Sequence, residues 1–324
     1  MIVGYGSIGK RHLKNLESMT KAEIILCTKR TDLKYLEKRG IKIFKKLSEC
    51  ISQKPDFGII TNETAFHISS AIKLAKNGID LFIEKPLSNS TKGVKDLEKI
   101  VKQRKIITQM GYNLRFHKGI EKIKKMIEQK KIGKIISVQC ENGSYLPDWH
   151  PYENYMDSYA GKQKLGGGII LTMIHDIDYL YWIFGNPKQV FSVAGKYSDL
   201  KISAEDYCAS IIEFKNKIIA ELHLDFFLRP EFRSCKIKGR KGIIYWDSKD
   251  NIVKLFNNDR KTWKVVLKLD NFERNDMYVR EMKHFLKCIK HRKKTINDLQ
   301  QGVETMNIAL AMKSSAKKEK VIKI

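Results

Sequence analysis

The glycines at positions 4, 6 and 9 constrain the fold of this chain more than any other feature of its sequence. They follow the apolar pair Ile2-Val3 and precede an amphipathic stretch, residues 8–18, so G-x-G-x-x-G joins a predicted strand to a predicted helix. The first glycine permits a tight turn, the second lets a pyrophosphate approach the backbone, and the third lets helix and strand pack closely. The pattern predicts a dinucleotide-binding turn formed by Gly4, Gly6, Ser7, Ile8 and Gly9.

The hydrophobic pattern changes near residue 115. Before that point, short apolar strands alternate with amphipathic helices, which predicts a parallel sheet covered on both faces. After it, extended segments with a period of two follow one another and are interrupted by one helical stretch, residues 170–184. The expected fold class is α/β: an N-terminal Rossmann doubly wound parallel sheet, then a C-terminal α/β domain with a large, mostly antiparallel open sheet.

The residues after the second predicted strand bear on the choice of cofactor. A carboxylate that binds the ribose 2′-hydroxyl of NAD is expected there, but the chain has Lys29 and Arg30 instead. Both cations suit a 2′-phosphate, and Arg30 could alternatively stack on adenine. The sequence therefore predicts NAD or NADP as the cofactor and modestly favours NADP.

The net charge of +26, from 62 basic and 36 acidic residues, raises the question of a nucleic-acid or membrane partner. The basic residues are spread along the chain and lack an accompanying aromatic stacking motif, so we expect no nucleic acid and no membrane partner. A basic surface suits anionic metabolites instead. The six cysteines are scattered without a CxxC pair, which predicts reduced thiols, no metal site and a cytoplasmic location.

Polar residues follow two later strands of the predicted parallel sheet. Thr61-Asn62 follows one and Glu84-Lys85-Pro86 follows the other, at the strand ends where open α/β sheets bind ligands. Pro86 restricts Lys85 to an extended backbone and permits a cis peptide bond.

The three motifs described so far and two further ones occur along the chain in a fixed order. That order is the glycine turn, Thr61-Asn62 with His67, Glu84-Lys85-Pro86, Gly111-Tyr112-Asn113-Leu114-Arg115-Phe116, and Gly166-Gly167-Gly168 followed by His175-Asp176-Ile177-Asp178. The ordered set closely resembles the Gfo/Idh/MocA family, named for glucose–fructose oxidoreductase and inositol dehydrogenase, over nearly the whole chain.

The resemblance implies the domain organisation. Residues 1–115 would bind NAD(P), and residues 116–297 would bind substrate and form a homo-oligomer, a dimer or tetramer, through the free face of the second sheet. The last helix, about 298–315, would pack back on the first domain.

The resemblance also implies the chemistry and its residues. Lys85 would contact substrate and relay a proton, and His175 would act as the general base while hydride passes to nicotinamide C4. The substrate would be a sugar, nucleotide sugar or cyclitol, with or without a phosphate. The cofactor contacts predicted outside the turn are Arg30, Thr61, Asn62, His67, Glu84, Lys85 and Asn113. The predicted substrate contacts are Lys85, Arg115, Trp149, Tyr152, Thr172, His175 and Asp178.

Two features of the C-terminal half leave alternatives open. Many family members carry an aspartate four residues before the histidine, where this chain has Leu171, so a nicotinamide-sensing regulator without catalytic activity remains an alternative to a dehydrogenase. A redox-assisted glycosidase, in which the cofactor oxidises the sugar transiently, is a second alternative. The aromatic residues Trp149 and Tyr152 could form a platform for a sugar ring or could anchor a surface loop.

Overall fold

The computed structural model describes residues 1–150 and 153–324, which divide into two compact units. Unit 1 comprises Met1–Tyr112 and Asn275–Val303, and unit 2 comprises Asn113–Arg274 and Glu304–Ile324. In the described part of the chain, no helix is both long enough and apolar enough to cross a membrane.

The sheet of unit 1 has six parallel strands in the order β3-β2-β1-β4-β5-β6. The strands are β1 (Ile2–Val3), β2 (Ile25–Cys27), β3 (Lys42–Phe44), β4 (Phe57–Ile60), β5 (Asp80–Ile83) and β6 (Thr108–Met110). The strand order reverses at β1, because β2 and β4 are its two neighbours. This is the predicted doubly wound sheet, and such a reversal opens a crevice at the carboxyl ends of β1 and β4.

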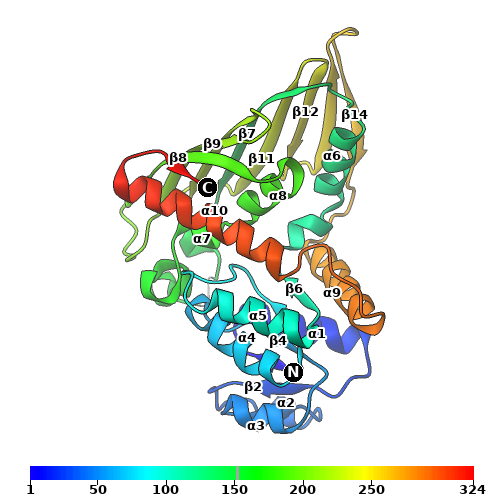
Figure 1. Cartoon of the computed structure of the whole chain (residues 1–324), viewed down its shortest axis with the longest axis vertical. Helices are drawn as coiled ribbons and strands as arrows, with labels where there is room; N and C mark the ends of the chain where they lie inside the picture. The colour runs from blue at the N-terminus through cyan, green and yellow to red at the C-terminus, as the bar shows by residue number, and fades with distance from the viewer. Residues whose placement is uncertain (151–152) are drawn as a thin grey trace. The chain divides into compact units, whose positions relative to one another are not determined.

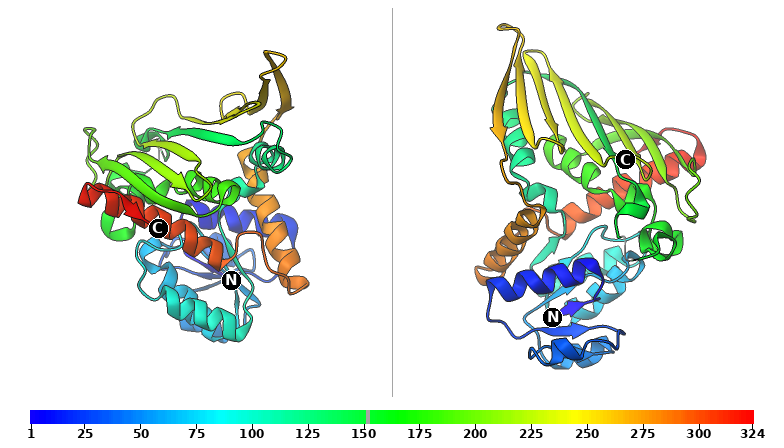
Figure 2. Two further views of the ribbon diagram at one scale, coloured as in Figure 1. Left: turned by 45° about the horizontal axis from the view of Figure 1, so that its top comes forward. Right: turned by 180° about the vertical axis from the view of Figure 1, so that it is seen from behind.

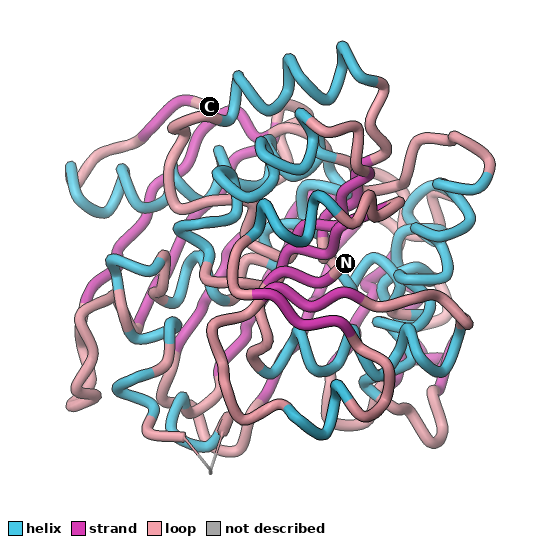
Figure 3. Tube along the Cα trace, turned by 90° about the horizontal axis from the view of Figure 1, so that it is seen from below, coloured by secondary structure: helices cyan, strands magenta, loops and turns pink. Residues whose placement is uncertain are grey.

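Helices cover both faces of this sheet (Figures 1 and 3). They are α1 (Ser7–Met19), α2 (Lys34–Glu37), α3 (Leu47–Ser52), α4 (His67–Lys76), α5 (Val94–Arg104) and α9 (Arg274–Lys290). Helices α4 and α5 lie on one face, whereas α1 and α9 lie on the other (Figures 1 and 2). Leu13 and Leu16 of α1 pack with Phe82, Met282 and Phe285 in one buried cluster, so α1 and α9 share the core of unit 1.

Unit 2 is built on a nine-stranded sheet in the order β14-β13-β12-β11-β7-β10-β9-β8-β15, antiparallel except where β7 and β10 pair. Its strands are β7 (Ile135–Gly143), β8 (Pro187–Gly195), β9 (Tyr207–Phe214), β10 (Ile219–Asp225), β11 (Phe232–Gly239), β12 (Gly242–Asp247), β13 (Ile252–Asn257), β14 (Thr262–Lys268) and β15 (Ile322–Lys323). The predicted open, mostly antiparallel sheet is therefore confirmed.

The helices of unit 2 cover one face of its sheet (Figure 2). They include α6 (Lys118–Glu128), α7 (Ile169–Thr172), α8 (His175–Phe184) and the larger part of α10 (Leu299–Lys318). The single helix expected over residues 170–184 is interrupted, because the backbone leaves the helical conformation at Met173 (φ −96°, ψ 28°).

The C-terminal part of the chain contributes to both units. Helix α9 belongs to unit 1, because Met282 and Phe285 are buried in its core. Most of α10 belongs to unit 2, where Thr305 and Ser315 hydrogen-bond to Asp178 and to the backbone of Ser192.

Candidate functional site

The glycine turn of unit 1 has the geometry that a dinucleotide phosphate needs. Gly4 has a left-handed φ of +100°, and a Cβ there would lie 2.6 Å from the backbone nitrogen of Asn62. A Cβ on Gly9 would lie 2.5 Å from the carbonyl oxygen of Gly4, so the third glycine permits close packing. A Cβ on Gly6 would meet nothing within 4 Å, which makes this position the open side of the turn.

The amino terminus of α1 is open in the same way. Gly6 is the N-cap residue and has no capping side chain, and the first turn of the helix carries no acidic residue. The first N–H groups of a helix lack intrahelical partners and attract anions. Gly6, Ser7 and Ile8 therefore fit the pyrophosphate of a nicotinamide dinucleotide.

Thr61 supports this turn from β4. Its hydroxyl lies 3.0 Å from the carbonyl oxygens of Val3 and Gly4, to which it donates, so it ties the end of β4 to the first glycine. The neighbouring Asn62 donates from its amide to the hydroxyl of Ser70 at 3.2 Å. Two predicted cofactor residues thus lie beside the glycine turn.

His67 joins the end of β4 to the residues after β5. Its two ring nitrogens lie 2.8 Å from the carbonyl oxygens of Asn62 and Pro86. The ring is buried, and this burial lowers the pKa of His67, whereas the contacts with the two carbonyl oxygens oppose the shift. The structure gives His67 a role in holding two strand ends together.

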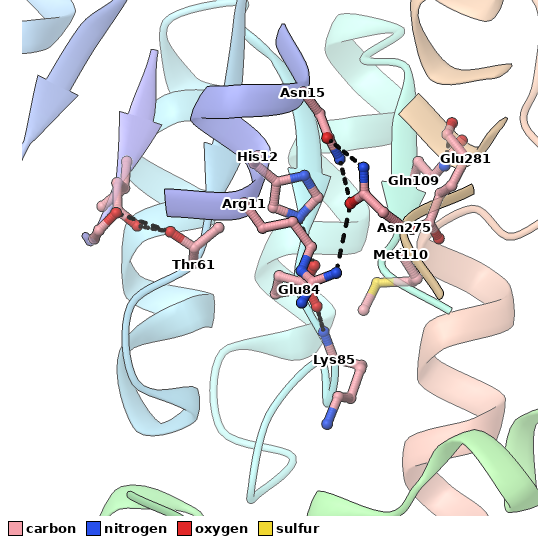
Figure 4. Close-up of polar contacts among 12 residues, drawn as sticks. Arg11, His12, Asn15, Thr61, Glu84, Lys85, Gln109, Met110, Asn275 and Glu281 are labelled. Carbon is pink, nitrogen blue, oxygen red and sulfur yellow. Dashed lines mark hydrogen bonds and ion pairs between the residues drawn. The ribbon is translucent and has the colours of Figure 1, made fainter. Parts of the chain in front are cut away.

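Lys85 is the second residue after β5 and is half-buried. The Lys85–Pro86 peptide bond is cis. The Lys85 backbone N–H donates to the buried Glu84 carboxylate at 3.1 Å, so the main chain is held where the side chain leaves the strand (Figure 4). Lys29 and Arg30 follow β2 and are exposed.

His12 of α1 is a residue that the sequence motifs did not single out. It is fully buried, and its Nε2 lies 2.7 Å from Oε1 of Glu84. The only sequence signal was its position among the buried residues of α1, three after Gly9 and beside Leu13.

In unit 2, His175 is the first residue of α8 and is half-buried. Leu171 lies in the separate helix α7 and is only 1% exposed, so it fills the core and does not occupy the same continuous helix as His175. Thr172 is also buried, as is Asn113 in the 3₁₀ turn Asn113–Phe116.

The side chains of Arg115 and Asp178 form an ion pair with each other. The guanidinium donates from Nε and Nη2 to the two carboxylate oxygens at 2.8 and 2.7 Å, and both side chains are fully buried. Burial raises the pKa of Asp178, and the positive charge of Arg115 opposes that shift. Each group is thus the partner of the other in unit 2, and the substrate contacts expected at Arg115 and Asp178 stay predictions.

The aromatic loop is described only in part. Trp149 is half-buried, donates from Nε1 to the Ser144 hydroxyl at 2.9 Å, and packs edge-on against Phe226 at 5.5 Å. Through these contacts Trp149 anchors the loop that contains it. The predicted substrate contact at Tyr152 lies outside the described residues.

A cavity of about 600 Å³ in unit 1 lies between α5, the start of β6 and the segment after α9. None of the predicted cofactor or substrate residues that the structure describes lines it. Among the described residues, no group of three or more His, Cys, Asp or Glu side chains is arranged to hold a metal ion.

Known proteins resemble the chain over its full length. Myo-inositol 2-dehydrogenase of Thermotoga maritima is 26% identical over all of this chain and 97% of its own length. A levoglucosan dehydrogenase in complex with NADH and L-sorbose has a TM-score of 0.89 at 18% identity, covering 100% of this chain and 97% of that one. The WlbA dehydrogenase of Bordetella pertussis, in complex with NADH and UDP-GlcNAcA, has a TM-score of 0.84 at 20% identity, with the same coverage.

The family models match both parts of the chain. Residues 1–112 match the oxidoreductase-family NAD-binding Rossmann fold, and residues 124–324 match the C-terminal α/β domain of the same family. The first match contains the glycine turn and Lys85, and the second contains His175. The chain therefore belongs to the Gfo/Idh/MocA family of oxidoreductases.

Proposed function

We propose that this protein is an NAD(P)-dependent dehydrogenase or reductase that transfers hydride between nicotinamide and a hydroxyl or keto carbon of a sugar, nucleotide sugar or cyclitol. One observation in unit 1 carries the proposal. The glycine turn follows β1, Thr61 follows β4 and Lys85 follows β5, so a phosphate-binding turn and a cationic side chain share one edge of a parallel sheet.

The names of similar proteins support this substrate class, since they describe an inositol dehydrogenase, a levoglucosan dehydrogenase and a dehydrogenase bound to a UDP-sugar. The net charge of +26 would also favour a phosphorylated or nucleotide-linked substrate.

In the proposed reaction, bound nicotinamide supplies the hydride acceptor at C4. His175 takes the proton of the substrate hydroxyl while the same carbon loses hydride, so a carbonyl forms and one proton leaves with the base. Lys85 binds the substrate oxygen and relays this same proton from the oxygen to the base. An imidazole suits the base because its ordinary pKa lies near neutral pH.

The test is a panel of sugars, cyclitols and nucleotide sugars with NAD and NADP, followed at the reduced-nicotinamide absorbance. Lys85→Met and His175→Asn should each lower kcat by about 100-fold or more on the substrate found. Lys102→Met, an exposed lysine of α5, is the matched control. Full turnover by folded Lys85→Met would overturn the role proposed for Lys85.

The proposed preference for NADP rests on the exposed Lys29 and Arg30. Arg30→Ala should weaken NADPH binding more than NADH binding, because only NADPH carries the 2′-phosphate. Equal loss for both cofactors would favour adenine stacking by Arg30.

We also propose a homo-oligomer formed through the outer face of the sheet in unit 2. On that face Phe191 and Ile211 are opposite each other in register, and they are 40% and 50% exposed; the nearby Val193 is 46% exposed. Ile211→Lys should shift the mass measured by light scattering toward the monomer. Val265→Lys, on β14 far along the strand order, is the control. The six cysteines are free and buried, which suits the proposed cytoplasmic location.

A further inference from the structure

The Glu84 carboxylate is held from two sides inside unit 1. Its Oε1 lies 2.7 Å from Nε2 of His12, and its Oε2 accepts the backbone N–H of Lys85 at 3.1 Å (Figure 4). A carboxylate oxygen only accepts, so the imidazole donates through Nε2. The His12 and Glu84 side chains are 0% and 7% exposed, so water has little access to compete for these bonds.

The space around this carboxylate is shaped for it. A Cβ on Gly111, the residue after β6, would lie 2.6 Å from Oε2 of Glu84, so only glycine leaves room there. The His12 ring meets Phe82 of β5 edge-on at 5.0 Å and Tyr278 of α9 at 6.3 Å. Packing therefore fixes the imidazole, and the imidazole fixes the carboxylate.

This arrangement links two parts of the proposed reaction. Helix α1 presents its amino terminus at the glycine turn, and one and a half turns later the same helix supplies His12. A chain of two hydrogen bonds then leads from His12 through Glu84 to the main chain of Lys85.

We propose that His12 is a positioning residue for hydride transfer: through Glu84 it fixes the backbone from which Lys85 reaches the substrate. The inference rests on the function proposed above, in which Lys85 contacts the reacting oxygen. Misplacing a reacting group by about 1 Å can cost about 100-fold in rate, so a small rotation of the Lys85 peptide is enough to matter.

The test uses the full chain with the substrate found in the panel above. His12→Phe keeps an aromatic ring between Phe82 and Tyr278 but removes the donor to Glu84. We expect kcat to fall about 100-fold while the Kd for NADH changes less than about threefold. His12→Gln places an amide nitrogen near the position of Nε2, and we expect it to recover kcat to within about tenfold of the wild type.

Asn15→Leu is the matched control. Asn15 is another buried polar residue of α1, and it pairs with Asn275 at 2.9 Å rather than with Glu84. Its loss should lower stability without lowering kcat. A structural role for His12 alone would give the same result for His12→Phe. If His12→Phe does not fold, His12→Asn replaces it, because its amide is too short to reach Glu84.

The outcomes separate the two proposals. Loss of turnover in Lys85→Met with normal kcat in folded His12→Phe or His12→Asn would overturn this inference alone. A panel without any substrate would overturn the proposed function, and this inference with it.

Discussion

The Arg115 guanidinium and the Asp178 carboxylate form a two-pronged ion pair in unit 2, and the Thr305 hydroxyl lies 3.1 Å from one of the same carboxylate oxygens, to which it donates. Both charged side chains are fully buried. A buried charge that loses its partner costs more than the pair contributes, because the desolvation of the remaining charge is no longer offset.

Arg115→Met should therefore lower the free energy of unfolding by about 3–5 kcal/mol, measured by urea denaturation. The double variant Arg115→Met/Asp178→Leu should lose less than the sum of the two single variants, because it leaves no unpaired charge. The opposite pattern, an unchanged unfolding midpoint with a raised KM, would support the predicted substrate contact of Arg115.

Substitutions of the second and third glycines of the turn should have different effects, one on cofactor binding and the other on stability. Gly6→Val places its Cβ in open space, so folding should be retained while the side chain blocks the approach of the pyrophosphate. We expect the Kd for NADH to rise by about tenfold or more, a loss of about 1.4 kcal/mol or more, measured by NADH fluorescence.

Gly9→Val places its Cβ against the Gly4 carbonyl oxygen and should lower the melting temperature of the protein without cofactor. Equal melting temperatures for the two variants would contradict this division of roles.

The order of elements could be predicted because each unit has a clear periodic signal. Continuous apolar strands marked the parallel sheet, and alternation marked β7, β9 and β10, whose buried positions follow a period of two. The strands β13 and β14 do not show this alternation of buried positions. β14 is exposed over its first four residues and lies at the edge of the sheet, so no buried face imposes a pattern on its sequence.

The candidate site was predictable where a motif fixes the backbone, as at the glycine turn. It was not predictable where the arrangement depends on a contact between distant residues. His12 and Glu84 are 72 residues apart, and only the packing of α1 against β5 brings them together. The same limit applies to the buried ion pair of Arg115 and Asp178, which are 63 residues apart and which the motifs did not predict to contact each other.

Replacing Leu171 by the aspartate found in many family members should not improve activity. Leu171 is buried in α7, and the helix is interrupted before His175, so a carboxylate at this position would enter the core. We expect Leu171→Asp to lose more stability than Leu171→Ala, which itself should cost about 2–5 kcal/mol. Thermal unfolding compares the two, and higher kcat in Leu171→Asp would contradict this assignment of Leu171 to the core.

His223 gives unit 2 a pH-dependent contribution to stability. Its Nε2 lies 2.9 Å from the buried Asp225 carboxylate, whose other oxygen accepts the backbone N–H groups of Phe227 and Leu228. The hydrogen bond to Asp225 raises the pKa of His223, and partial burial opposes this shift. A pKa that is higher in the folded state means that the stabilisation is complete below the unfolded value of about 6.5 and is lost as pH rises through the folded value.

The difference in unfolding free energy between the wild type and His223→Gln should therefore be larger at about pH 5.5 than at about pH 8.5. The His223 side chain is 37% exposed, so solvent screening should keep the change below about 1 kcal/mol. Urea unfolding of both proteins at the two pH values measures it, and the comparison cancels the titration of groups that do not interact with His223. A difference that stays constant or grows with pH would show that the imidazolium–carboxylate pair does not stabilise the folded state.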